Sequence, residues 1–183
     1  TSFKLNTFDT SNVENMNMMF FSCNSLLDID ISSFDTSKVT NMEAMFVGCR
    51  SLTKLDLSSF NTSKVTTMAR MFEACVSLTH LDLDTFYTQN VKNMSAMFQE
   101  LGCESLDLKT FDTRNVTDMS KMFYNYSKLK EVNLRSFNTR KVTNMAAMFY
   151  GCTALEEVVY LDRITNIAIT QLEQHYEQLE KEQ

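Results

Sequence analysis

The 183-residue chain contains no proline, no tryptophan, three glycines and two histidines. So few glycines leave no glycine-rich loop of the kind that binds phosphate groups, and two histidines provide little material for a histidine-based catalytic site. No apolar run approaches the roughly 18 residues that a membrane span needs, and no charged-then-apolar signal segment opens the chain. A mature or excised soluble segment is therefore expected.

Positive charge is also scarce, because 17 Lys and Arg residues stand against 23 Asp and Glu residues, which gives a formal net charge of −6. Binding to nucleic acid needs clustered positive charge, so nucleic acid is not expected as a partner. Methionine and phenylalanine are plentiful, with 13 and 14 copies. Such a bias is typical of one short pattern copied many times.

The copied pattern is a repeat of about 26 residues. The dipeptide Met-Phe recurs six times, at residues 19–20, 45–46, 71–72, 97–98, 122–123 and 148–149. One unit, from Leu52 to Ser77, reads LTKLDLSSFNTSKVTTMARMFEACVS. A period of 20–29 residues that carries L-x-x-L-x-L is the signature of a leucine-rich repeat. We expect six repeats and a degenerate seventh to form one domain over residues 1–168.

The repeat predicts a leucine-rich-repeat-like solenoid, a right-handed coil with a parallel β-sheet on one face and short helical turns on the other. Alternating residues such as Leu55 and Leu57 indicate strands, because only a strand sends every second side chain to one face. Apolar spacings of three and four in M-x-x-M-F-x-x-C predict the helical turns. A column of threonines beside short polar residues predicts hydrogen-bond ladders that stabilise the remaining turns.

The last residues, ITQLEQHYEQLEKEQ, are polar and rich in helix formers. They predict a C-terminal α-helix over residues 169–183, outside the repeat. Three roles remain open for this helix: a cap on the last hydrophobic layer of the solenoid, a linker to another domain, or a segment for self-association.

The five cysteines follow the repeat and form no C-x-x-C pattern; they are Cys23, Cys49, Cys75, Cys103 and Cys152. This spacing favours buried free thiols that act as small hydrophobic groups over a zinc site or disulfides. The methionine columns raise the alternative of a copper site, but their helical spacing beside phenylalanine favours packing in the core. No metal or other cofactor is expected.

One polar column is a candidate site. Four carboxylates occupy the outward position between two inward strand residues, at Asp30, Asp56, Asp82 and Asp107. Stacked at strand spacing, they repel one another unless water, cations or a basic partner intervenes. Either they bond locally and keep the sheet soluble, or they form an acidic strip on which a partner docks. The strip would be flanked by the variable residues Lys54, His80, Asp84, Lys109, Glu131 and Arg135.

Catalysis is not expected, because no nucleophile with a base partner and no pair of carboxylates can be assembled from the repeated columns. Variable residues on a rigid repeated face are how repeat arrays usually recognise partners. We therefore expect a non-catalytic protein-binding module. The alternative is a structural spacer or assembly element that has no specific ligand.

The segments FDTSKVTNMEAMFVGC and SLTKLDLSSF closely resemble the BspA-like leucine-rich repeats of bacterial surface proteins. The resemblance covers residues 1 to about 168. It implies a tandem array on a secreted, lipid-anchored or wall-anchored protein, with adhesion to host or matrix proteins as the recurring theme. An extracellular or cell-surface location and a protein or glycoprotein ligand are what the resemblance implies for this chain.

Overall fold

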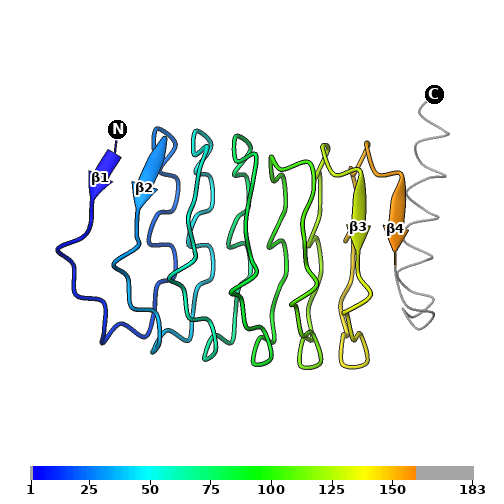
Figure 1. Cartoon of the computed structure of the whole chain (residues 1–183). Helices are drawn as coiled ribbons and strands as arrows, with labels where there is room; N and C mark the ends of the chain where they lie inside the picture. The colour runs from blue at the N-terminus through cyan, green and yellow to red at the C-terminus, as the bar shows by residue number, and fades with distance from the viewer. Residues whose placement is uncertain (1, 160–183) are drawn as a thin grey trace.

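The structure is a computed structural model that describes residues 2–159. It contains four short strands: β1 (Ser2–Lys4), β2 (Asp28–Asp30), β3 (Glu131–Asn133) and β4 (Glu157–Val159). β1 pairs in parallel with β2, and β3 pairs in parallel with β4. Figure 1 shows the chain between these pairs as a row of coils that lie side by side. We number the coils 1 to 6; they cover residues 2–26, 27–52, 53–78, 79–103, 104–129 and 130–155.

Backbone hydrogen bonds join neighbouring coils along the M-x-x-M-F segment. Alternate N–H groups of one coil donate to carbonyl oxygens of the next coil. Between coils 1 and 2, the N–H groups of Met16, Met18, Phe20 and Ser22 donate to the carbonyl oxygens of Asn41, Glu43, Met45 and Val47 over 2.7–3.0 Å. The same pattern of four bonds recurs at each boundary up to coil 6. All of these N–H groups point toward the next coil. At each boundary, one coil therefore supplies a row of donors and the next coil supplies a row of acceptors.

The predicted fold class, a right-handed leucine-rich-repeat solenoid with helical turns, is wrong. Residues 2–159 contain no helix. The M-x-x-M-F segment consists instead of tight turns, with bonds such as Met19 N–H to the Met16 carbonyl, and it has left-handed residues at Met18 (φ 56°) and Ser22 (φ 55°). A left-handed residue cannot continue an α-helix. The N–H groups that would bond within a helix bond to the neighbouring coil, so the three- and four-residue apolar spacing comes from turns.

The predicted sheet is also wrong, because the described residues form two separate pairs of strands and no single continuous sheet. In coil 3 the side chains of Leu55 and Leu57 are still buried, but no strand forms there. The Asp56 carboxylate accepts the Ser58 N–H over 2.9 Å and turns the chain directly after these residues. The predicted C-terminal helix over residues 169–183 and the end of the degenerate seventh copy lie outside the described residues.

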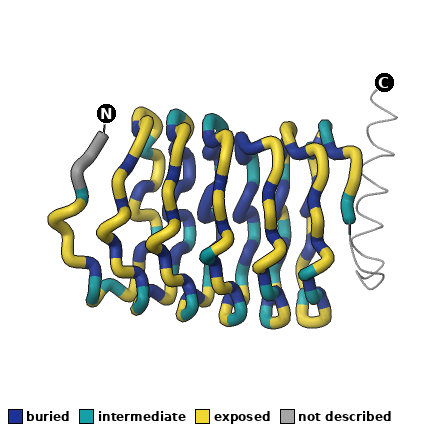
Figure 2. The backbone as a smooth tube through the Cα atoms, viewed as in Figure 1, coloured by how far each residue is buried: buried dark blue, intermediate teal, exposed yellow. Residues whose placement is uncertain are grey.

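The core runs through the inside of the row of coils (Figure 2). One phenylalanine from each Met-Phe dipeptide stacks on the equivalent ring of the next coil, with ring centroids 5.2–6.1 Å apart, in the order Phe20, Phe46, Phe72, Phe98, Phe123 and Phe149. Offset stacking of aromatic rings adds attraction beyond the burial of their area. The six coils therefore share one continuous aromatic ladder.

A second ladder consists of six buried threonines, Thr10, Thr36, Thr62, Thr88, Thr113 and Thr139. In coil 3, the Thr62 hydroxyl donates to the Tyr87 carbonyl over 3.0 Å and accepts the Tyr87 N–H over 2.8 Å. A hydroxyl can do both because it carries a donor and two acceptor lone pairs. The threonine column thus satisfies backbone groups at the corner of each neighbouring coil, as the sequence predicted.

Gly102 lies where coil 4 departs from the regular spacing. A Cβ atom at this position would overlap the Val76 carbonyl oxygen and lie 2.9 Å from the Leu78 carbonyl oxygen, both on the backbone of coil 3. We expect Gly102→Ala to lower the free energy of unfolding by about 2 kcal/mol, because the backbone of one coil must move. Urea unfolding measures the loss. Gly48→Ala is the matched control: its Cβ would have ordinary contacts, and only its φ of +71° is unfavourable. A smaller loss for Gly102→Ala than for Gly48→Ala would contradict this account.

Candidate functional site

The predicted acidic strip lies on the outside of the coils. Asp30 is the last residue of β2, and its side chain is exposed between the buried Ile29 and Ile31. Asp56, Asp82 and Asp107 are exposed in the same column of the next three coils. In coil 6 this position is Asn133, at the end of β3. The structure therefore places the four carboxylates in one outward row, one in each of four successive coils.

Each carboxylate in the row forms a local bond to the residue two positions later. Asp30 accepts both the N–H and the hydroxyl of Ser32, and Asp82 accepts the Asp84 N–H over 2.9 Å. The bonds from Ser32 lower the pKa of Asp30, and corresponding bonds from Ser58 and Lys109 lower the pKa of Asp56 and Asp107. The lowered pKa values keep the carboxyl groups of Asp30, Asp56 and Asp107 ionised at neutral pH. The four carboxylates therefore bond locally, as one of the two interpretations predicts, and their side chains still face outward.

Only one of the flanking cations neutralises the row directly. The Lys109 ammonium lies 2.7 Å from an Asp107 oxygen and 3.3 Å from an Asp84 oxygen, so it bridges coils 4 and 5. Lys54 and His80 are exposed, and the Arg135 N–H donates to the Asn133 side chain. The predicted residues Lys109, Asp84 and Asp107 therefore meet in one cluster, whereas no described contact joins Lys54 or Arg135 to the carboxylate row.

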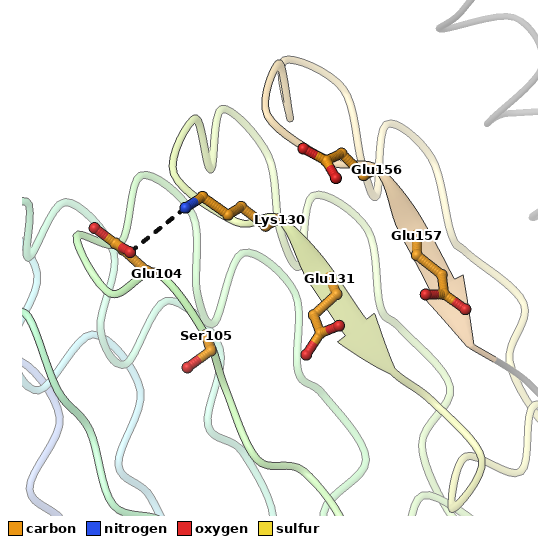
Figure 3. Close-up of a pocket in the computed structure, with 6 residues that line it drawn as sticks. All are labelled: Glu104, Ser105, Lys130, Glu131, Glu156 and Glu157. Carbon is orange, nitrogen blue, oxygen red and sulfur yellow. Dashed lines mark ion pairs between the residues drawn. The ribbon is translucent and has the colours of Figure 1, made fainter.

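Two hollows lie among the described residues, and the smaller of them includes two carboxylates of the row. The smaller, of about 280 Å³, is lined by Leu55, Asp56, Leu57, Ser58, His80, Asp82 and Thr85. The larger, of about 610 Å³, is lined by Glu104, Ser105, Lys130, Glu131, Glu156 and Glu157, and is drawn in Figure 3. We call the larger one the glutamate hollow. It contains four carboxylates and one ammonium group, and among these six residues one ion pair forms, between Lys130 and Glu104 over 3.8 Å.

The sequence prediction named Glu131 but missed the other five residues of the glutamate hollow. A signal was available: the missed residues occupy the two variable positions that precede the first inward strand residue of each coil. Lys54, His80 and Glu131 belong to one of these columns, and Ser105 and Glu157 continue it. The neighbouring column supplies Glu104, Lys130 and Glu156. Following both columns through coils 5 and 6 and on to residues 156–157 would have found the hollow.

The described cysteines are free, and four of them are buried: Cys49, Cys75, Cys103 and Cys152. Their thiols pack in the core, and the Cys49 and Cys75 thiols donate to carbonyl oxygens of the preceding coil. Burial raises the pKa of Cys49 and Cys103 from 9.0 to about 11 and that of Cys152 to about 12. Within residues 2–159, no three His, Cys, Asp or Glu side chains are grouped so that they could hold a metal ion.

These raised thiol pKa values predict a loss of stability in alkaline solution. Below pH 9 the thiols are neutral in both the folded and the unfolded chain, so they do not favour unfolding. Between pH 9 and about 11 the unfolded chain releases protons that the folded chain retains, and the free energy of unfolding falls. Thermal unfolding at pH 7.5 and pH 10 measures this change. The Cys49→Ala variant lacks one such thiol, so its stability should fall less between pH 7.5 and pH 10. An equal fall in the variant would contradict the assignment of this loss to the buried thiols.

Comparison with known proteins identifies a family that matches this chain. The model of a family described as "Mycoplasma protein of unknown function, DUF285" matches residues 1–102 and again residues 79–181. No curated protein is significantly similar in sequence. Two solved structures show a weak likeness. A leucine-rich cell surface protein from Faecalibacterium prausnitzii has 16% identity and a TM-score of 0.33, and a leucine-rich repeat protein from Bacteroides ovatus has 16% identity and a TM-score of 0.23.

These likenesses cover 79% and 80% of this chain, and 35% and 63% of the two solved chains. The chain therefore spans less than two thirds of either protein, and scores this low assign neither fold to it. No helix that could cross a membrane occurs among residues 2–159. The family match is different in kind, because its two segments together cover nearly the whole sequence. The chain thus belongs to the DUF285 family, described as Mycoplasma proteins of unknown function.

Proposed function

We propose that this chain is a non-catalytic binding module that engages a protein or glycoprotein with a basic surface. The observation that carries the proposal is the outward row of Asp30, Asp56, Asp82 and Asp107, two of which, Asp56 and Asp82, line a hollow of about 280 Å³. Charges arranged on a rigid surface select partners of complementary charge and speed their association. Arginine and lysine side chains of a partner would meet ionised carboxylates repeated from coil to coil.

The glutamate hollow supports the same class of partner. Within the described part of the chain, no cation pairs with Glu131, Glu156 or Glu157, whereas Glu104 faces Lys130. Figure 3 shows Glu131 on β3 and Glu157 on β4, on neighbouring strands. Like charges on neighbouring strands are unfavourable, and a bound cationic group removes that repulsion. Binding would therefore gain more from a basic side chain here than from a neutral one.

The test is to remove charge from the row without disturbing its turns. Asparagine keeps the side-chain oxygen that accepts the local N–H, as Asn133 does with Arg135 over 3.1 Å. We expect the triple variant Asp30→Asn, Asp56→Asn, Asp82→Asn to bind the ligand about tenfold more weakly while its unfolding midpoint stays unchanged. Surface plasmon resonance against a panel of purified matrix proteins measures the affinity of the full chain and of the variant.

The matched control makes the same charge change in another column of the repeat. Asp9, Asp35 and Asp112 also accept N–H groups two residues later, and they are replaced by asparagine together. The control should bind within about twofold of the original chain. If neither the original chain nor the control binds any panel member at concentrations up to about millimolar, the alternative of a spacer without a specific ligand is favoured.

We propose a cell-surface or secreted location on the resemblance of the FDTSKVTNMEAMFVGC repeat to repeats of bacterial surface proteins. An antibody against the purified chain tests it: intact cells that carry the full-length protein should be labelled, and a short protease treatment of those cells should remove the label. Labelling only after the cells are permeabilised would contradict the proposed location.

A further inference from the structure

Positive charge gathers at one turn of the later coils. In coil 3 this turn is formed by residues 63–64, and coils 3 to 6 carry exposed cations in the turn or directly after it. The equivalent segments of coils 1 and 2, residues 8–15 and 34–41, have three carboxylates and one cation. We call the exposed cations of coils 3 to 6 the basic corner; they are Lys64, Lys92, Arg114, Arg140 and Lys141.

Few carboxylates neutralise the basic corner. The same segments of coils 3 to 6 contain two: Asp112 pairs with Arg114 over 2.8 Å, and Asp118 accepts local hydrogen bonds. Unpaired charges on a rigid surface attract groups of the opposite sign. Within residues 2–159, three cations of the corner have no ion pair and are available to an anionic partner: Lys64, Lys92 and Arg140.

The cations of the basic corner follow the row of coils. Hydrogen bonds between neighbouring coils fix the turns side by side: the Asn90 amide donates to the Ser63 carbonyl, and the Lys141 ammonium donates to the Asn115 side chain over 2.7 Å. The phenylalanine ladder gives the step from coil to coil, 5.2–6.1 Å. A linear polyanion that lies along the row (Figure 1) would therefore meet at least one cation at each of four successive coils.

The basic corner also has groups that suit a sugar. Tyr87, two residues before the turn of coil 4, is 61% exposed, which is the highest value among the exposed large hydrophobic side chains of the described residues. A tyrosine ring packs against the C–H face of a sugar while its hydroxyl stays hydrated. The Gln89 side chain and the Asn90 Oδ1 atom have no hydrogen-bond partner within residues 2–159, so they can bond to sugar hydroxyls.

Other polyanions fit the basic corner less well. Single-stranded nucleic acid binds through several aromatic side chains on which successive bases stack. In these segments of coils 3 to 6, Tyr87 is the one exposed aromatic side chain. A sugar ring is comparable in length to the step between coils. A polysaccharide that is charged only through carboxylates on alternate rings leaves alternate coils unmatched, whereas sulfation places charge on most rings.

We propose that the basic corner binds a sulfated linear polysaccharide that lies along coils 3 to 6, with sulfate groups on Lys64, Lys92 and Arg140 and one sugar ring on Tyr87. This site is separate from the outward row of carboxylates, because the turn at residues 58–59 lies between Asp56 and Lys64. The site has the opposite charge and takes another class of ligand, so it goes beyond the binding of a basic protein proposed above.

Surface plasmon resonance of the full chain on immobilised heparin tests the charged contacts. The triple variant Lys64→Gln, Lys92→Gln, Arg140→Gln should bind at least tenfold more weakly at about 0.15 M salt. The slope of log affinity against log salt concentration should fall by about 2, because three fewer cations displace counterions from the polysaccharide. An unchanged affinity and slope would overturn the proposed site.

The matched control removes three exposed cations that lie outside the basic corner, through Arg50→Gln, Lys121→Gln and Lys128→Gln. This control has the same net charge as the first variant and should bind heparin within about twofold of the original chain. Equal weakening in the two variants would show that total charge and not the corner decides binding, and would overturn the site. So would a failure of the original chain to bind heparin.

Tyr87→Ala tests the contact with a sugar ring. It should weaken heparin binding about fivefold and leave the salt slope unchanged, because it removes an apolar contact and no charge. Hyaluronate, which has carboxylates and no sulfates, and a single-stranded DNA oligonucleotide are compared as soluble competitors at equal total charge. Heparin should compete best. Equal competition by either molecule, or an unchanged affinity of Tyr87→Ala, would overturn the assignment to a sulfated polysaccharide.

Discussion

Replacing Phe98 by alanine is expected to lower the free energy of unfolding by about 4 kcal/mol. Phe98 is fully buried, and its ring stacks between Phe72 at 6.1 Å and Phe123 at 5.8 Å. The truncation leaves a cavity in the middle of the aromatic ladder, and losses of about 3–5 kcal/mol are usual for such a change. The neighbouring rings cannot close the gap, because each is held by a coil that is bonded on both sides. Urea unfolding followed by circular dichroism measures the loss.

Phe8→Ala is the control for this prediction, because its ring is 57% exposed at the end of the row. It should change the free energy of unfolding by less than about 0.5 kcal/mol. A loss for Phe98→Ala that is no larger than the loss for Phe8→Ala would show that the ladder does not hold the coils together. A second, earlier transition in the Phe98→Ala unfolding curve would fit the nearest-neighbour cooperativity typical of repeat proteins.

The second large effect is expected at Thr62. Thr62→Val keeps the shape of the side chain but removes the hydroxyl that serves both the N–H and the carbonyl of Tyr87. Two backbone groups at a partly buried corner are then left without this partner, and each such loss costs about 1–3 kcal/mol. We expect the free energy of unfolding to fall by about 3 kcal/mol in urea.

Thr66→Val is the matched control within the same coil. The Thr66 hydroxyl donates to the Thr40 carbonyl over 3.1 Å, but the side chain is exposed, so water can replace the bond. The control should lose less than about 1 kcal/mol. Similar losses at Thr62 and Thr66 would indicate that the threonine column acts through packing and not through its paired hydrogen bonds.

The sequence predicted which side chains face inward better than it predicted backbone conformation. Inward columns such as Leu55, Leu57 and Phe72 follow from side-chain chemistry, because apolar groups repeated at a fixed period must be buried together. The threonine ladder was also predictable, because a short hydroxyl side chain in a turn bonds to nearby backbone groups. These features depend on composition and period, and both are visible in one sequence.

The helical turns were predicted wrongly because apolar spacing does not determine where backbone N–H groups bond. A spacing of three and four fits one face of a helix, and it also fits a series of tight turns whose free N–H groups find acceptors one repeat away. The tight turns need left-handed φ values at Ala44 (57°), Arg70 (60°) and Ala96 (53°). Alanine and arginine are not residue types from which a left-handed conformation would be predicted. A left-handed alanine is unfavourable by roughly 1–2 kcal/mol, and the bonds between coils offset this cost.

The candidate site was predicted in part. The row of Asp30, Asp56, Asp82 and Asp107 was visible because it recurs with the period. The glutamate hollow was missed because its residues, such as Lys130 and Glu156, change from coil to coil and have no fixed residue type. Variable positions become a site only when the register of neighbouring coils is known, and the structure supplies that register through the pairing of β3 with β4.

The hydrogen bonds between coils run in one direction along the M-x-x-M-F segments, and this gives each row of bonds an electrical polarity. In every M-x-x-M-F segment the bonded N–H groups point toward the C-terminal end of the row and the accepting carbonyl groups point toward the N-terminal end. Peptide dipoles aligned in this way sum along the axis of the row, as they do along a helix, but with the negative pole at the N-terminal end. This negative pole favours cations beside the end coil, and the effect falls off within that coil.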